Sequence, residues 1–180
     1  TLLVHGGFDS FIEEFYGILY SLAGAGYDVV AFDGPGQGAT LQMHKLKHEH
    51  DWEKPVAAIL DFYGLKEAIL MGISFGGYWC LRAAAFEKRI KKVIAFGVYY
   101  DLLEGTNPFV RKLVLHMMKW EKLMNASIRM RMKAFPFIKH IVNQCLFISG
   151  NEGKAPIEAA RWILKMNKTH IHSEQVTQDV

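Results

Sequence analysis

The stretch AILMGISFGGYWCLRAAAF, residues 68–86, contains the most informative pattern in the chain. Its first five residues form a short apolar run, which is typical of a strand buried on both faces of a parallel sheet. The residues from Phe75 onward predict a helix, so only a very tight turn can join the two elements. Gly72 and Gly76, on either side of Ser74, remove Cβ atoms where strand and helix approach each other. We therefore expect Ser74 in a strained backbone conformation, with its Oγ projecting from the turn.

A serine presented in this way is a candidate nucleophile. The helix that follows directs backbone N–H groups and the positive end of its dipole toward the serine. The N–H of Phe75 is thus a candidate donor of an oxyanion hole, which stabilises the negative charge that develops during acyl transfer. A plain turn with an incidental serine is the alternative. The clear strand and helix patterns on both sides of Ser74 favour the functional interpretation.

A second donor is expected from the segment His5-Gly6-Gly7-Phe8. This segment directly follows the apolar run of residues 1–4, which predicts another buried strand. Glycines let the backbone turn its N–H groups inward, and we predict the Phe8 N–H as the second donor, with Gly7 as the nearest alternative. His5 precedes the serine in the chain, so we expect it to shape the loop rather than to act as a base.

The first 102 residues alternate strand and helix patterns. Strands separated by helices of about ten to fifteen residues indicate βαβ units and a doubly wound parallel sheet, so the predicted fold class is α/β. A glycine-rich turn, DGPGQG at residues 33–38, follows the second predicted strand. Ser10 with Glu13 three residues later predicts a capping box for the first helix. The other elements are expected as strands at 28–32 and 92–96 and as helices at 10–23 and 51–63.

The chain changes character near residue 103. Residues 104–172 carry 12 basic and 4 acidic side chains, a local charge of +8 in a chain whose net charge is +3. Their pattern predicts three or four short helices, whereas the last residues look like the beginning of a new strand. We therefore expect a core at residues 1–102, a helical cap at 103–172 and a return to the core at 173–180.

Three motifs in order, HGGF at residues 5–8, DGPGQG at 33–38 and GISFGG at 72–77, resemble the α/β-hydrolase superfamily. The similarity is greatest to the branch with a DGPGQG turn and covers residues 1–102, whereas the later helices agree only in position and helical character. The resemblance implies a mostly parallel sheet flanked by helices, with a helical cap inserted after the strand that ends near Phe96. It also implies that Asp33 braces the glycine-rich turn.

The same resemblance implies a catalytic acid and a histidine after the serine, in that order. The acid is expected after a strand beginning near Val176, and the histidine later still. Both positions would lie beyond Val180, so we interpret the chain as the central fragment of a longer polypeptide. Asp101 is a position where some relatives carry the acid, although it could equally cap the first element of the cap. The histidines in or beside the cap are poor candidates for the base: His116, His140, His170 and His172.

These features predict a serine hydrolase that cleaves a carboxylic ester, or a related small acyl compound, through an acyl-enzyme at Ser74. Peptide, thioester or carbon–carbon bond hydrolysis would use the same groups, since the fold does not choose among them. A non-catalytic ligand-binding or scaffold protein that lacks the complete triad is the alternative from another class. No cofactor is expected.

Other sequence features narrow the partners. The segment with His44, His48 and His50 is interpreted as a solvated loop, so no metal site is predicted. No apolar stretch reaches the roughly 18 residues that span a bilayer. The basic charges are spread among apolar helix positions, which predicts neither a nucleic-acid nor a membrane surface. Cys80 and Cys145 lie outside any CxxC pair and predict buried thiols, which favours a cytoplasmic protein. A homodimer is left open.

Overall fold

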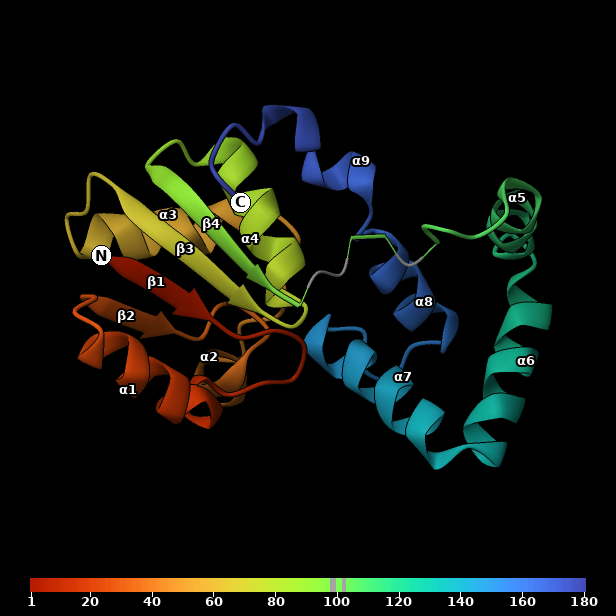
Figure 1. Cartoon of the computed structure of the whole chain (residues 1–180). Helices are drawn as coiled ribbons and strands as arrows, with labels where there is room; N and C mark the ends of the chain where they lie inside the picture. The colour runs from red at the N-terminus through yellow and green to blue at the C-terminus, as the bar shows by residue number, and fades with distance from the viewer. Residues whose placement is uncertain (98–99, 102) are drawn as a thin grey trace. The chain divides into compact units, whose positions relative to one another are not determined.

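The computed structural model describes residues 1–97, 100–101 and 103–180. Its contacts divide the chain into two compact units, Thr1–Tyr100 with Asn167–Val180, and Asp101–Met166. The first unit contains the sheet, and the second consists of helices and their connections (Figure 1). Among the described residues, no helix is both long enough and apolar enough to cross a membrane.

Four parallel strands form the sheet, in the order β2-β1-β3-β4. The two central strands are buried along almost their whole length, which explains their continuous apolar sequences. In the register of β1 and β3, His5 lies beside Gly72, so the segments after these strands emerge side by side. Next to β4, Asp179 forms an isolated parallel bridge with Lys92. The predicted α/β class is therefore confirmed, with strands β1 Leu2–His5, β2 Val29–Phe32, β3 Ala68–Ile73 and β4 Ile90–Phe96.

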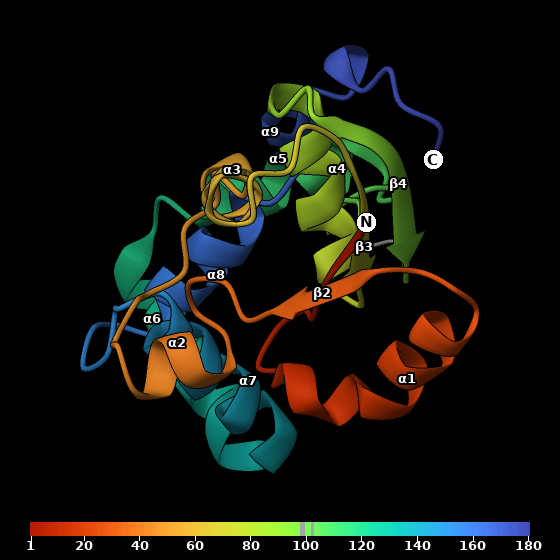
Figure 2. The same cartoon turned by 90° about the vertical axis from the view of Figure 1, so that its left-hand side faces the viewer.

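Helices cover both faces of this sheet (Figure 2). On one face lie the 3₁₀ turn η1 and helix α1, whose Phe15, Leu19 and Leu22 pack against apolar side chains of β1 and β3. Helices α3 and α4 lie on the opposite face. The bounds are η1 Ile12–Phe15, α1 Tyr16–Gly24, α2 Gly38–Gln42, α3 Glu53–Phe62, α4 Gly76–Phe86, α9 Lys168–Ile171 and η2 Ser173–Gln175.

The start of the first helix differs from the prediction. Instead of Ser10 and Glu13, the N-cap is Phe11, whose N–H donates to Glu14 Oε1 at 3.4 Å. Ser10 is buried, and its hydroxyl donates to the carbonyl oxygen of Gly7 at 3.2 Å. The predicted cap is wrong because this hydroxyl holds the preceding loop instead of the helix.

The second unit contains four described helices, in line with the three or four expected. Prolines begin α5 and α7, where a missing N–H leaves no helical hydrogen bond unmade. Asn107 caps α5 by accepting from the Phe109 N–H at 2.8 Å. Arg161 pairs with Glu158 at 2.5 Å and with Glu121 of α6, which ties α8 to α6. The bounds are α5 Pro108–Met117, α6 Glu121–Ala134, α7 Pro136–Ile148 and α8 Ile157–Leu164.

Residues 167–172, expected at the end of the cap, belong by their contacts to the sheet unit. The hydroxyl of Tyr78 in α4 accepts from the Asn167 N–H at 3.0 Å and lies 3.1 Å from His170 Nδ1. Arg82, also in α4, donates to the carbonyl oxygen of His170 at 2.6 Å. These bonds attach α9 to the helix that follows Ser74.

Candidate functional site

Ser74 stands on the turn between the end of β3 and the start of α4. Its φ is 58°, in the left-handed region that a serine rarely adopts. Its N–H donates to the Phe96 carbonyl oxygen at 2.8 Å, and its own carbonyl oxygen accepts from the Gly77 N–H at 2.9 Å. Ser74 is exposed, although Ile73 before it is buried. The strained conformation expected from the sequence is present, whereas the catalytic role of Ser74 stays a prediction.

The contacts around Gly72 and Gly76 explain why both are glycine. A Cβ at Gly72 would lie 2.0 Å from the carbonyl oxygen of Gly76, and a Cβ at Gly76 would lie 2.5 Å from the carbonyl oxygen of Gly6. Backbone atoms cannot rotate away as a flexible side chain can. Glycine at both positions therefore allows β3, α4 and the loop after β1 to meet.

The loop after β1 packs directly on this turn. A Cβ at Gly7 would lie 2.7 Å from the backbone nitrogen of Phe75 and 2.8 Å from the carbonyl oxygen of Ile73. The ring centroids of Phe8 and Phe75 are 5.9 Å apart. The two segments predicted to carry the oxyanion donors are thus in contact, and the donor roles of Phe8 and Phe75 stay predictions.

His5 ends β1 and is fully buried. Its Nε2 lies 3.2 Å from Nε1 of Trp52, and because an indole N–H only donates, Nε2 is the acceptor. The proton of the neutral ring is therefore on Nδ1, which donates to the Gly6 carbonyl oxygen at 2.9 Å. Burial lowers the pKa of His5 to about 4, against the opposing effect of the Gly6 bond. At neutral pH, His5 is an uncharged support for the loop.

Asp33 begins the glycine-rich turn, and its predicted bracing role agrees with the hydrogen bonds that its carboxylate accepts. Its carboxylate oxygens accept from the Ile12 and Ala39 N–H groups, each at 3.0 Å. Burial raises the pKa of Asp33, while these two hydrogen bonds lower it. Gly38 has a φ of 31°, and a Cβ there would lie 1.8 Å from Asp33 Oδ2. The carboxylate and Gly38 together shape this turn.

Two buried side chains near this site were missed by the sequence interpretation. Gln37 Nε2 donates to the carbonyl oxygens of Gly6 at 2.7 Å and Gly7 at 3.0 Å, which joins the glycine-rich turn to the loop after β1. Trp52 donates to His5, as described above, and is fully buried. A signal for Gln37 existed, because an amide in a glycine-rich turn has backbone groups within reach. No local pattern indicated Trp52.

The segment with His44, His48 and His50 was predicted to be a solvated loop, and the structure differs at His48, whereas His44 is exposed. His48 is 8% exposed, and its ring lies 5.7 Å from the ring of Trp52 and 4.7 Å from that of Trp79. Burial, followed by the neighbouring His50, lowers the pKa of His48 well below its usual value. The prediction is wrong for His48, because Trp79 of α4 and Trp52, the N-cap of α3, enclose its imidazole. Among the described residues, no group of three or more His, Cys, Asp and Glu side chains is arranged to hold a metal ion.

Asp101, the alternative position for a catalytic acid, is buried in the helical unit. Its Oδ1 accepts from the Leu103 N–H at 2.9 Å, and its Oδ2 accepts from Arg111 at 3.1 Å. Both oxygens thus stabilise the beginning of this unit, which favours the structural interpretation of Asp101.

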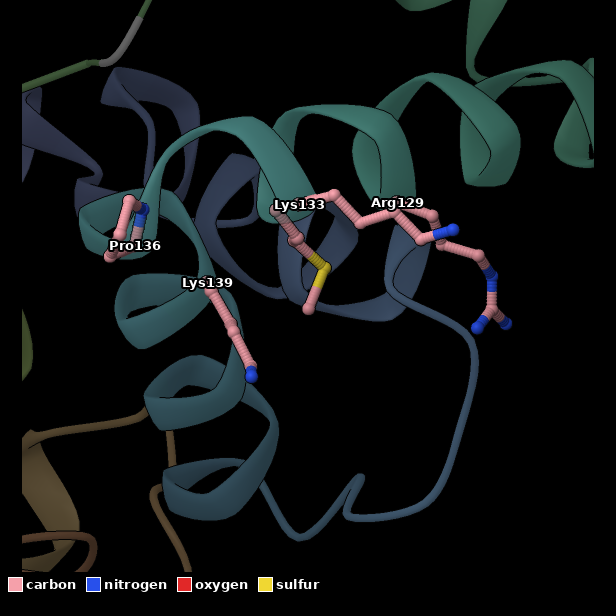
Figure 3. Close-up of a pocket in the computed structure, with 5 residues that line it drawn as sticks. Arg129, Lys133, Pro136 and Lys139 are labelled. Atoms are coloured by element: carbon pink, nitrogen blue, oxygen red, sulfur yellow. The ribbon is translucent and has the colours of Figure 1, made fainter.

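Two of the cavities in the helical unit are lined by residues of both α6 and α7. One, of about 300 Å³, is lined mainly by apolar side chains of α5 to α8, with Arg131 as its charged member. The other, of about 440 Å³, lies beside α6 and α7, where Arg129 and Lys133 project from α6 and Lys139 from α7 (Figure 3). Neither lining includes a residue of the three sequence motifs, so the candidate catalytic groups lie elsewhere.

Residues 2–124 match the family described as the alpha/beta hydrolase fold. The chain belongs to this family. This alpha/beta hydrolase is 44% identical over 119 residues to 20-hydroxy-prefusarin hydrolase FUS2 of Gibberella moniliformis, covering 59% of the chain and 28% of the relative. It is 32% identical over 183 residues to hydrolyase poxO of Penicillium oxalicum, covering 92% of the chain and 42% of the relative. The chain therefore spans less than half the length of these curated relatives.

Solved structures show the same fold. The crystal structure of the 2,6-dihydroxy-pseudo-oxynicotine hydrolase has a TM-score of 0.65 at 19% identity, covering 98% of this chain and 43% of that one. AbyA5 has a TM-score of 0.57 at 21% identity, covering 94% of this chain and 41% of that one. The predicted α/β-hydrolase fold is confirmed by these likenesses together with the family match.

Proposed function

We propose that the protein is a serine hydrolase in which Ser74 attacks the carbonyl carbon of a carboxylic ester or a related small acyl compound. The observation that supports this proposal is the exposed Ser74, held at a φ of 58° between β3 and α4 with the loop after β1 packed against it. Strain of this kind, which costs about 1–3 kcal/mol, persists where the surroundings impose it and is concentrated at functional sites. The hydrolase names of FUS2 and poxO support the general reaction class.

In the proposed mechanism, Ser74 Oγ gives its proton to a histidine and adds to the substrate carbonyl carbon. The N–H groups of Phe8 and Phe75 donate hydrogen bonds to the resulting oxyanion. Collapse of this intermediate releases the alcohol, which takes the proton from the histidine, and leaves an acyl group on Ser74. Water activated by the same histidine then releases the acid and regenerates the serine.

The histidine of this mechanism is not His5. Both nitrogens of its imidazole are engaged, with Trp52 and with the Gly6 carbonyl oxygen, and its pKa is lowered to about 4. We assign the base and its acidic partner to the part of the relatives' length that this chain does not span, in the order serine, acid, histidine.

A fluorophosphonate probe tests the nucleophile directly in the full gene product. We expect covalent labelling that maps to Ser74 by peptide mass spectrometry and disappears in Ser74→Ala. Circular dichroism of Ser74→Ala, matching that of the unsubstituted protein, is the control for folding. If the folded full gene product is not labelled, the hydrolase proposal fails, and a ligand-binding or scaffold protein becomes the better interpretation.

A substrate panel then decides the bond that is cleaved. Matched aryl and alkyl esters, thioesters, peptides and compounds with a carbon–carbon bond next to a ketone all present a carbonyl carbon to the same nucleophile. We expect the highest kcat/KM for a carboxylic ester. A preference for a peptide or for carbon–carbon cleavage would keep Ser74 as the nucleophile and correct the substrate class.

A further inference from the structure

Gln37 holds two consecutive peptide groups of the loop after β1. The residue is 1% exposed, and its Nε2 donates to the carbonyl oxygens of Gly6 and Gly7 at 2.7 and 3.0 Å. Its Oε1 accepts from the Gly34 N–H at 2.8 Å. An amide flip would turn Oε1 toward two carbonyl oxygens, so the hydrogen-bond partners define the orientation of this amide.

These bonds also determine where the next N–H group points. No cis peptide bond occurs among the described residues, and in a trans peptide the C=O and N–H point in opposite directions. Gln37 and Ser10 hold the Gly7 carbonyl oxygen at 3.0 and 3.2 Å, so the Phe8 N–H points away from these two side chains. Gly7 itself lies against the start of α4, because a Cβ there would be 2.7 Å from the Phe75 nitrogen.

We propose that Gln37 is a positioning residue for the oxyanion hole, because its hold on the Gly7 carbonyl oxygen aims the Phe8 N–H at the oxyanion formed on Ser74. This role rests on the proposed function and deepens it. A donor of the hole acts where negative charge develops, so rotating this peptide lowers kcat more than it weakens substrate binding. The peptide before it is held in the same way, since the Gly6 carbonyl oxygen accepts from both Gln37 and His5.

The experiment uses Gln37→Met in the full gene product, which keeps the length of the side chain and removes both its donor and its acceptor. An ester is compared with its thionoester, in which the carbonyl oxygen is replaced by sulfur, a weak hydrogen-bond acceptor. We expect kcat for the ester to fall about 10- to 100-fold with little change in KM. The thionoester rate should fall much less, so the ratio of ester to thionoester rates decreases.

A matched control makes the same chemical change outside the site. Gln42→Met alters an exposed residue at the end of α2 and should leave both rates unchanged. Equal losses for both substrates in Gln37→Met would overturn the inference, because a smaller folded fraction or a less reactive serine lowers both rates alike. An unchanged ester rate would overturn it as well.

A second variant keeps the inference testable if Gln37→Met does not fold. Ser10→Ala removes the other hydrogen bond to the Gly7 carbonyl oxygen and should lower the ester to thionoester ratio about 3-fold. An unchanged ratio in that variant would overturn the positioning role. Failure of the proposed function looks different: the unsubstituted protein would hydrolyse neither substrate and would not react with the fluorophosphonate probe, and the role of Gln37 would fall with it.

Discussion

Replacing Gly72 by alanine tests how closely β3 and α4 approach each other. The added Cβ would lie 2.0 Å from the carbonyl oxygen and 2.3 Å from the carbonyl carbon of Gly76. Favourable carbon contacts lie at about 3.5–4.0 Å, so the start of α4 would have to move by more than about 1 Å. Both obstructing atoms belong to the backbone, and no change of rotamer relieves the contact.

The expected cost follows from this displacement. Overpacking in a well-packed core usually costs about 1–3 kcal/mol, and a shift of the backbone itself places Gly72→Ala near about 3 kcal/mol. Gly17 provides the matched control, because it lies in the first turn of α1 and, apart from its chain neighbours and its own helix backbone, no atom lies within 4 Å of its Cβ position. Alanine at that site should stabilise the protein by about 0.5–1 kcal/mol through its better helix propensity.

Urea unfolding of the full gene product at neutral pH, followed by tryptophan fluorescence, measures both effects. The same Gly→Ala change should shift the unfolding midpoint downward at position 72 and upward at position 17. If Gly72→Ala unfolds at the midpoint of the unsubstituted protein, the close approach of β3 and α4 is wrong. A clear loss of stability in Gly17→Ala would instead contradict the free space for a Cβ at this position of α1.

Three further predictions concern the same protein. Because the left-handed backbone at Ser74 costs a residue with a Cβ about 1 kcal/mol, Ser74→Gly should have a higher urea midpoint than Ser74→Ala, and equal midpoints would contradict the strain. The pKa of His5 falls from 6.5 to about 4 on folding, so its contribution to stability is complete above pH 6.5 and is lost as the pH falls toward 4. Between pH 7.5 and 5, this effect lowers the free energy of unfolding by about 2 kcal/mol. In His5→Asn, which keeps a donor, the free energy of unfolding should decrease less over the same pH range. An equal decrease in both proteins would exclude His5 as its source. Arg82 donates to Glu53 at 3.0 and 2.8 Å with its side chain only 8% exposed, so Arg82→Met should lower the free energy of unfolding by about 3 kcal/mol. The more exposed Arg89 is the control, since Arg89→Met should lower the free energy of unfolding by less than about 1 kcal/mol. Similar losses of stability in Arg82→Met and Arg89→Met would refute the greater importance of the buried ion pair.

Features with local causes could be predicted from the sequence. The apolar runs of β1 and β3 predicted a parallel sheet, because strands buried on both faces leave no polar alternation. Gly72 and Gly76 around Ser74 predicted the strained turn, since only residues without a Cβ permit so close an approach of strand and helix. The contact between the Phe8 and Phe75 segments followed from the same logic, because neighbouring parallel strands end at the same edge of a sheet.

Features that depend on distant partners were decided by the tertiary structure alone. Trp52 lies 47 residues from His5, which it bonds, and Gln37 lies 31 residues from Gly6, so no local pattern pairs them. His48 looked solvated in sequence because its neighbours are polar, yet the two tryptophans against its ring bury it. The physical reason is the same in each case. Burial and hydrogen bonding depend on which groups meet after the chain has folded, whereas turns and strand patterns depend on neighbours along the chain.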